Sequence, residues 1–176
     1  MIVLNQLKNF IVIFGIFVIS LYSCKREKTV IPILELSSSA CHGECPIFDL
    51  KLYENKVYFN LIENNSRKGI YEYNLSDLDK KSINKLVSKI DYNNLKNEYT
   101  SAIQDIQVYN SVLHKNQNRK EVYFYPMNAP DDYYKLIEYV INLKDIHFLS
   151  KMDTIITFNT RKGMEIDEIE IPLIPK

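Results

Sequence analysis

The sequence predicts an α+β domain in which two helices pack on one face of an antiparallel sheet. Apolar and polar residues alternate with a period of two through much of residues 47–74, which is typical of strands with one buried face. Two later segments have the 3.6-residue period of amphipathic helices. Strands and helices occur in blocks instead of alternating one by one, and this order favours α+β over α/β architecture.

Three strands form a predicted β-meander. The alternating pattern places them at Ile47–Tyr53, Lys56–Ile62 and Gly69–Asn74. In the first two strands, the apolar residues that share one face are Phe48, Leu50, Leu52, Val57, Phe59 and Leu61. The Glu54-Asn55 step between them predicts a tight hairpin, because asparagine tolerates a positive φ angle better than any residue except glycine.

The first helix begins after the meander, at a capping box formed by Ser76 and Asp79. Its buried face consists of Ile83, Leu86, Val87 and Ile90. A loop over Asp91–Ala102 follows. The alternating pattern then predicts two more strands, Asp105–Leu113 and Arg119–Tyr125.

The second helix begins at Pro130, whose fixed φ angle suits the first turn of a helix. Asp131 and Asp132 favour the same start, because acidic side chains stabilise the N-terminal end of the helix dipole. The buried face consists of Tyr133, Leu136, Ile137, Val140 and Leu143. The tail alternates again and predicts one or two further strands, at Thr154–Phe158 and Glu165–Ile171.

Residues 1–23 are predicted to be a signal peptide. Asn9–Ser23 is an uncharged, mostly apolar run preceded by one base, Lys8, and it is shorter than the ~20 apolar residues of a membrane-spanning helix. It ends in Leu21-Tyr22-Ser23-Cys24, which resembles the lipobox of bacterial lipoproteins. That resemblance implies a diacylglycerol on Cys24, which would then be the first residue of the mature chain. The alternative is an uncleaved anchor helix.

The chain therefore divides into a signal peptide (1–23), a tether (24–32), an α+β domain (33–149) and a C-terminal β tail (150–176) that we expect to pack on the same domain. The sequence Lys25-Arg26-Glu27-Lys28 after Cys24 lacks the acidic run of a surface-export signal. We therefore expect a lipid-anchored protein on the periplasmic side of a membrane, with the outer membrane favoured over the inner.

The composition excludes several functions. With 22 basic and 22 acidic residues, the chain has no global field that would attract nucleic acid. Only 4 glycines are present, and neither GxGxxG nor a P-loop occurs. No HExxH and no nucleophile elbow with its triad is found. We therefore predict a protein that is not an enzyme, requires no cofactor and binds no nucleic acid.

The segment Cys41-His42-Gly43-Glu44-Cys45-Pro46 holds the one cluster of chemically capable residues in the sequence. The favoured interpretation is a Cys41–Cys45 disulfide, because a short loop with a central glycine can turn tightly enough and exported proteins form such bridges. The bridge would stabilise the fold modestly, since the loop that it closes is short.

Two other interpretations of the same segment stay open. Cys41 and Cys45 could bind copper or zinc with His42, or with a distant His114 or His147. The C-x3-C-P string is similar to that of copper-delivering SCO-type proteins, although in those the second cysteine opens a helix and here Pro46 precedes a strand. Thiol exchange is disfavoured, because a reactive thiolate needs nearby positive charge and Glu44 carries the opposite sign.

A family resemblance rests on Cys41, Gly43, Cys45, Pro46 and Phe48, on the strand and hairpin that follow, and on three further matches: Gly69-Ile70-Tyr71, Tyr99 with Asp105, and Ala129-Pro130. Over roughly residues 32–149 the chain resembles DUF6438, a domain of unknown function. The family occurs in lipoproteins and exported proteins of Bacteroidetes-type bacteria. The resemblance implies no activity and no catalytic residues.

These observations predict a lipid-anchored envelope protein that acts as a binding or structural module. Its expected partners are the membrane, through the lipid, and an envelope protein or glycan. The alternative function is that of a metal-binding or thiol-redox protein built on the cysteine pair.

Overall fold

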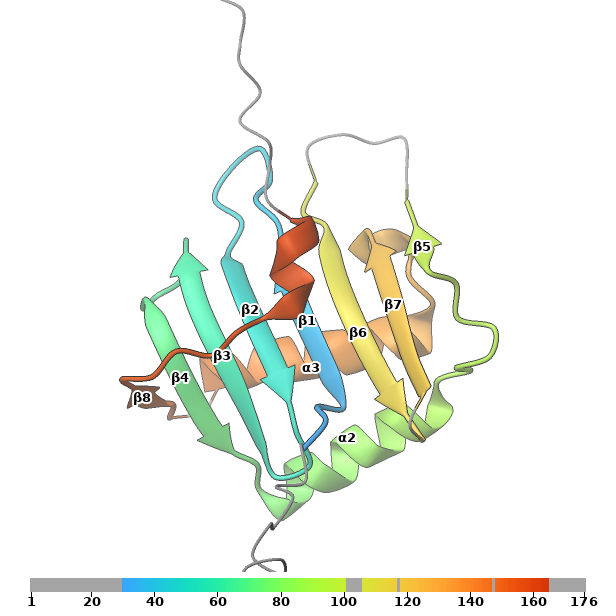
Figure 1. The fold of residues 1–176 in the computed structure, drawn as a ribbon, viewed down its shortest axis with the longest axis horizontal. Coiled ribbons are helices and arrows are strands. Elements are labelled where there is room, and N and C mark those ends of the chain that lie inside the picture. The colour runs from blue at the N-terminus through green and yellow to red at the C-terminus, as the bar shows by residue number, and fades with distance from the viewer. Residues whose placement is uncertain (1–29, 101–105, 117, 147, 165–176) are drawn as a thin grey trace, which may run out of the picture. The chain divides into compact units, whose positions relative to one another are not determined.

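An eight-stranded sheet with the order β5-β7-β6-β1-β2-β3-β4-β8 forms the centre of the computed structural model (Figure 1). The structure describes residues 30–100, 106–116, 118–146 and 148–164. The strands are β1 (Leu34–Ser38), β2 (Ile47–Leu52), β3 (Lys56–Glu63), β4 (Gly69–Asn74), β5 (Glu98–Tyr99), β6 (Tyr109–Lys115), β7 (Asn118–Phe124) and β8 (Ser150–Met152). In this sheet β5 and β7 pair in parallel, and the other neighbouring strands pair antiparallel. The predicted α+β class is therefore confirmed.

The β-meander consists of β2, β3 and β4, as predicted. Its registers pair Leu50 with Phe59 and Phe59 with Tyr71. The hairpin at residues 54–55 is present, because the Tyr53 N–H donates to the Lys56 carbonyl at 2.8 Å. The expected positive φ angle is wrong for this turn, since the non-glycine residues with positive φ in the described chain are Asn64 and Asn116.

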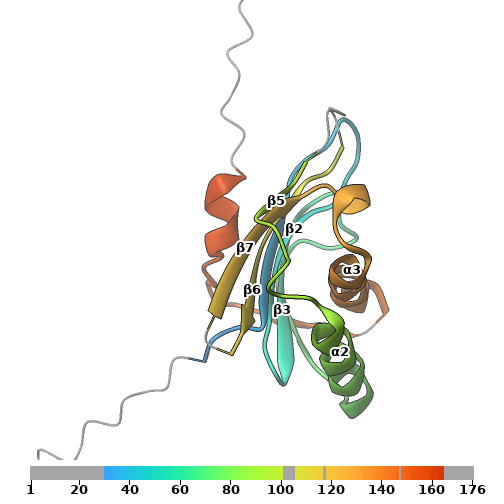
Figure 2. The same cartoon turned by 90° about the vertical axis from the view of Figure 1, so that its right-hand side faces the viewer.

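Two helices cover one face of the sheet (Figure 2). They are α2 (Asp77–Lys89) and α3 (Asp131–Ile146), close to the predicted positions. Apolar side chains from both helices and from the strands make one core on this face. The predicted helix residues that are at most 2 % exposed are Ile83, Tyr133, Leu136, Ile137, Val140 and Leu143.

Two strands were not predicted. β1 lies at the centre of the sheet, between β2 and β6, but its five residues are too few to establish a period. β5 falls within the expected loop over residues 91–102 and exists because the Tyr123 and Tyr125 N–H groups donate to the Asn97 and Tyr99 carbonyls. β6 begins at Tyr109, later than the predicted Asp105, which lies outside the described residues.

The C-terminal tail adds a strand to the sheet, as predicted, but this strand is Ser150–Met152 and not Thr154–Phe158. β8 pairs with β4 at the sheet edge, and the chain then crosses the second face of the sheet, opposite the helices, to a short 3₁₀ helix, η2 (Asn159–Gly163) (Figures 1 and 2). The strand expected at Thr154–Phe158 is absent, because a segment that crosses the strands cannot align with a strand neighbour. The strand predicted at Glu165–Ile171 lies outside the described residues.

Asp79 joins β4, α2 and α3. Its carboxylate accepts hydrogen bonds from the Ser76 N–H at 3.1 Å and the Ser76 hydroxyl at 2.5 Å, which confirms the predicted capping box. It also accepts from the hydroxyls of Tyr73 on β4 and Tyr139 on α3, both at 2.9 Å. Burial alone would raise the pKa of Asp79, but these hydrogen bonds outweigh it and hold the pKa below its ordinary value.

We predict that Asp79→Asn destabilises the protein by about 1–2 kcal/mol at pH 7, because the charged hydrogen-bond acceptor of the cap is lost. Because the pKa of Asp79 is lower in the folded state, the ionised carboxylate stabilises the fold at pH values above the ordinary carboxyl pKa. This stabilisation is lost as the pH falls through the pKa of the folded state. The difference between wild type and Asp79→Asn should therefore shrink below about pH 4.

Urea unfolding at pH 7 and at pH 3 measures both effects. Asp77→Asn is the matched control, because Asp77 lies in the same helical turn and its side chain is fully exposed. An Asp79→Asn deficit of equal size at both pH values would contradict the assignment.

Candidate functional site

The cysteine motif forms the connection between β1 and β2. Cys41 and Cys45 are joined by a disulfide with a Cα–Cα distance of 5.7 Å, which agrees with the favoured interpretation. This disulfide-closed loop, residues 39–46, extends beyond the end of the sheet (Figure 1). His42, Gly43 and Glu44 at its tip are exposed.

Gly43 is required by the backbone of the loop. Its φ angle of +149° is one that residues with a side chain rarely adopt. The Gly43 N–H donates to the Cys41 carbonyl at 2.8 Å and closes a tight turn inside the disulfide ring. The bridge and this turn together fix the shape of the exposed tip.

The base of the loop is anchored to β6 through Gln107 and Val108. The Gln107 side-chain amide donates to the Ser39 carbonyl at 3.0 Å and to the Pro46 carbonyl at 2.7 Å, so it joins the two arms of the loop. Ser39 and Val108 exchange two further hydrogen bonds, from the Ser39 N–H to the Val108 carbonyl and from the Val108 N–H to the Ser39 hydroxyl. The loop therefore has a rigid attachment on both arms.

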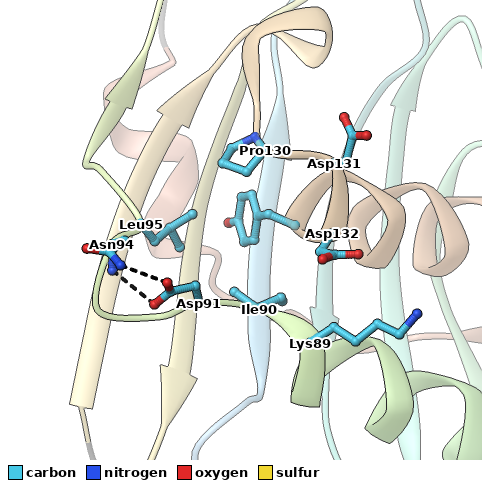
Figure 3. Close-up of a pocket in the computed structure, with 9 residues that line it drawn as sticks. Lys89, Ile90, Asp91, Asn94, Leu95, Pro130, Asp131 and Asp132 are labelled. Atoms are coloured by element: carbon cyan, nitrogen blue, oxygen red, sulfur yellow. Dashed lines mark hydrogen bonds between the residues drawn. The ribbon is translucent and has the colours of Figure 1, made fainter.

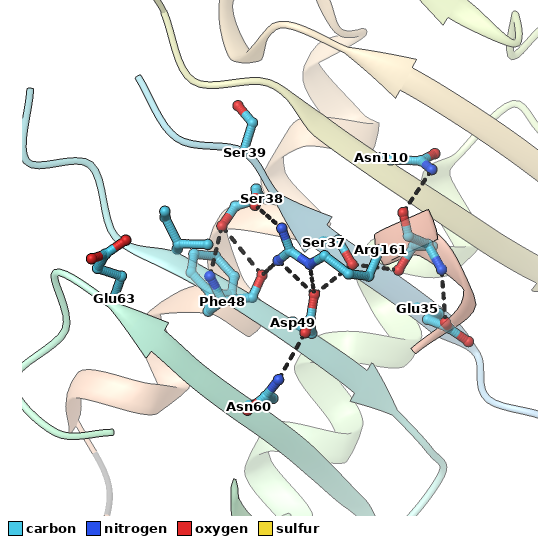
Figure 4. A network of polar contacts seen from close by, with 12 residues as sticks. Glu35, Ser37, Ser38, Ser39, Phe48, Asp49, Asn60, Glu63, Asn110 and Arg161 are labelled. Carbon is cyan, nitrogen blue, oxygen red and sulfur yellow. Dashed lines mark hydrogen bonds and ion pairs between the residues drawn. The ribbon is translucent and has the colours of Figure 1, made fainter. Parts of the chain in front are cut away.

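A network of polar contacts lies on the second face of the sheet, where β1 ends and β2 begins (Figure 4). The guanidinium of Arg161, from η2, is at its centre. Its Nε donates to Asp49 Oδ1 at 2.8 Å, Nη1 to the Ser38 carbonyl at 2.8 Å and Nη2 to the Phe48 carbonyl at 2.9 Å. Nη2 also lies 2.6 Å from Asp49 Oδ1 in an ion pair.

Neighbouring strands hold the Asp49 carboxylate in place. The Ser37 hydroxyl on β1 donates to Oδ1 at 2.6 Å, and the Asn60 amide on β3 donates to Oδ2 at 2.9 Å. The Asp49 side chain is only 3 % exposed, whereas that of Arg161 is 23 % exposed. Asp49 is therefore a buried charge with a partner that solvent can still reach.

Glu35 is a second buried carboxylate on the same face. It accepts hydrogen bonds from the backbone N–H groups of Asn159 and Thr160 and pairs with Lys51 at 3.2 Å. The Asn110 side chain donates to the Thr160 carbonyl at 3.0 Å. These contacts fix the backbone of η2 over the sheet.

Sequence patterns do not identify Glu35, Asp49 and Arg161 as site residues. Asp49 alternates with the apolar residues of β2, which is typical of a strand with one solvated face, but in the structure the second face is also covered and Asp49 is buried. The arginine that pairs with Asp49 is 112 residues away in sequence. No local pattern connects such a pair.

The structure does not bring His114 to the cysteines. His42 lies on the exposed tip of the loop, and His114 lies at the opposite end of β6, where its N–H donates to the Ile33 carbonyl. Burial, with a contribution from Arg119, lowers the pKa of His114. His147 lies outside the described residues. In the described part of the chain, no group of three or more His, Cys, Asp and Glu side chains could hold a metal ion.

A separate cavity of about 240 Å³ lies between the end of α2 and the start of α3 (Figure 3). It is smaller than a typical ligand pocket of roughly 300–1,000 Å³. Asp91 at its rim accepts from the Asn94 side-chain amide at 2.7 Å, and Asp131 and Asp132 belong to the first turn of α3. Asp91 thus stabilises the local loop. Asp131 and Asp132 lie at the start of α3, as predicted from the sequence.

Fold and site define an α+β domain in which a disulfide-closed loop connects the two strands β1 and β2, with an arginine-centred polar network at the base of that loop. The chain belongs to the family described as a domain of unknown function, DUF6438, whose model matches residues 32–144. The predicted resemblance is thereby confirmed. No curated protein matches the chain. None of the helices in the described residues has the length and apolar character needed to cross a membrane.

The disulfide predicts a specific thiol count. In a Cys24→Ser background, we expect an alkylating reagent to label no cysteine until the protein is reduced, and then to label Cys41 and Cys45. Replacing both by serine should destabilise the protein by about 2 kcal/mol, because a loop this short restricts the unfolded chain only modestly.

Intact mass before and after reduction, with urea unfolding, measures these effects. Free thiols in the protein as isolated, together with stoichiometric copper or zinc in elemental analysis, would contradict the disulfide interpretation and support the metal hypothesis.

Proposed function

We propose that the protein is a lipid-anchored, non-enzymatic binding module of the bacterial envelope, and that the disulfide-closed loop is its contact surface. The observation that carries this proposal is a rigid loop whose tip, His42-Gly43-Glu44, is exposed while both of its arms are tied to the sheet. Such preorganisation reduces the entropy lost when a loop binds a partner.

The polar groups of the domain support binding over catalysis. Asp49 and Glu35 are engaged by internal donors, and the buried Ser111 and Tyr133 hydroxyls bond each other at 2.5 Å. Both motif sulfurs are used by the bridge. The exposed side chains of the loop tip, His42 and Glu44, are available to a partner.

The position of the loop suits a tethered module. The described chain enters the sheet at Leu34, at one end of β1, and the loop leaves from the other end, after Ser38. A lipid on Cys24 would be joined to the sheet by the tether, and residues 25–32 can extend roughly 28 Å. The loop would then lie at the end of the sheet away from the tether attachment.

The proposed location is the periplasmic side of a membrane, with the outer membrane favoured. It is supported by the lipobox-like Leu21-Tyr22-Ser23-Cys24 and by the absence of an acidic run after Cys24 in the sequence. The proposed partner is an envelope protein or glycan.

Lipid attachment predicts that labelled palmitate enters the wild-type protein and not Cys24→Ala, and that the variant leaves the membrane fraction. Two or three acyl chains account for the anchoring, at about 0.8 kcal/mol for each buried CH₂ group. The measurement is gel autoradiography of membrane and soluble fractions. A Cys24→Ala protein that still takes up label and stays on the membrane would exclude the lipoprotein assignment.

Partner binding predicts that His42→Ala/Glu44→Ala reduces the amount of partner cross-linked to the acylated protein in its own envelope. The matched control is Arg119→Ala/Glu121→Ala, which also removes a basic and an acidic side chain from an exposed position, at the other end of the sheet. Quantitative mass spectrometry of the captured material compares the variants. Equal capture by both variants would refute the loop as the contact surface.

A further inference from the structure

We infer that the second face of the sheet carries a receptor for a guanidinium group, which Arg161 of the chain's own C-terminal segment fills and which an arginine side chain of a peptide partner can occupy in its place. The inference concerns a site other than the loop tip and goes beyond the proposed function. Asp49 with the Ser38 and Phe48 carbonyls forms the receptor.

The geometry of the receptor is specific for a guanidinium. Its acceptors bind three different nitrogens, Nε, Nη1 and Nη2, at 2.6–2.9 Å. A lysine ammonium has a single nitrogen and cannot reach acceptors distributed around a planar fork. The negative charge of Asp49 excludes neutral amides of similar shape, because an uncompensated buried carboxylate is costly.

Hydrogen bonds from the strands hold the shape of the receptor. Ser37 and Asn60 orient the Asp49 carboxylate from the two neighbouring strands. The Phe48 N–H donates to the Ser38 hydroxyl at 2.9 Å, which fixes the two carbonyl-bearing residues relative to each other. A site held by rigid elements and supporting hydrogen bonds keeps its geometry for more than one ligand.

Receptor and occupant belong to different parts of the chain. The residues of the receptor lie within the range 32–144 that matches the family model, whereas Arg161 lies beyond it. Arg161 is presented by a five-residue 3₁₀ helix and is partly open to solvent. Exchange of this arginine requires displacement of η2, whose Thr160 is buried, but of no strand of the receptor.

The contacts of η2 define the class of ligand. Besides the guanidinium, the sheet recognises the backbone before the arginine, because Glu35 accepts from the Asn159 and Thr160 N–H groups and Asn110 donates to the Thr160 carbonyl. The matching ligand is a peptide with an arginine preceded by two residues whose backbone is free to hydrogen-bond. The competing segment of the chain itself keeps this site closed until such a peptide displaces it.

Chemical rescue of Arg161→Ala in the full chain tests the receptor. Ethylguanidinium replaces the atoms that this substitution removes, so we expect it to raise the thermal midpoint of the variant. It should have no such effect on the wild type, on Arg119→Ala or on Arg161→Ala/Asp49→Asn. Ethylammonium at the same concentration is the control for charge alone. Equal effects of the two cations, or equal effects on all four proteins, would overturn the receptor.

Peptide binding tests the partner. A labelled peptide with the sequence of residues 157–164 should bind Arg161→Ala about tenfold more tightly than a peptide with lysine at the arginine position, and the wild type should bind it weakly, because its own Arg161 competes. If Arg161→Ala does not fold alone, both experiments are run as refolding with the probe present. Recovery of folded protein with ethylguanidinium or the arginine peptide, and not with ethylammonium or the lysine peptide, is then the expected result, and equal recovery or none would overturn the receptor. Equal binding of the two peptides, or none, would overturn the partner site. Either result leaves the loop-capture experiment unaffected.

Discussion

Glu35 on β1 and Asp49 on β2 are buried carboxylates on the second face of the sheet, and the C-terminal segment must supply partners for them. They are 4 % and 2 % exposed, and carboxylates removed from water need opposite charge or several N–H donors. The Lys51 ammonium and the Thr160 N–H of η2 are partners of Glu35. The Arg161 guanidinium of η2 is the charged partner of Asp49. The crossing of the C-terminal segment over the sheet follows from this requirement.

The same contacts connect the Arg161 network to the disulfide-closed loop. Ser38 and Phe48, whose carbonyls accept from Arg161, stand where β1 ends and β2 begins, on either side of the loop. The disulfide and Gln107 limit how far these two strands can separate at that end. The contacts of Arg161 and the attachment of the loop therefore meet at the same ends of β1 and β2.

The two faces of the sheet are held by different kinds of interaction. On the helix face, apolar side chains from strands and helices make a continuous core, which contributes stability roughly in proportion to the buried area. On the second face, buried polar groups contribute little net energy, but they require a specific arrangement, because each unsatisfied donor or acceptor costs free energy. Burial of apolar area on the helix face therefore stabilises the folded chain. The polar contacts on the second face determine the path of the C-terminal segment.

The sequence by itself determined the α+β class, the meander, both helices with their buried residues, the Ser76–Asp79 cap and the cysteine pair, because these depend on periodicity or on neighbours a few residues apart. The tertiary structure alone decided the central position of β1, the parallel β5, the course of residues 153–164 and the Asp49–Arg161 ion pair. Each of these joins residues far apart in the chain. Their pairing follows from which polar groups are buried together, and a local sequence pattern does not contain that information.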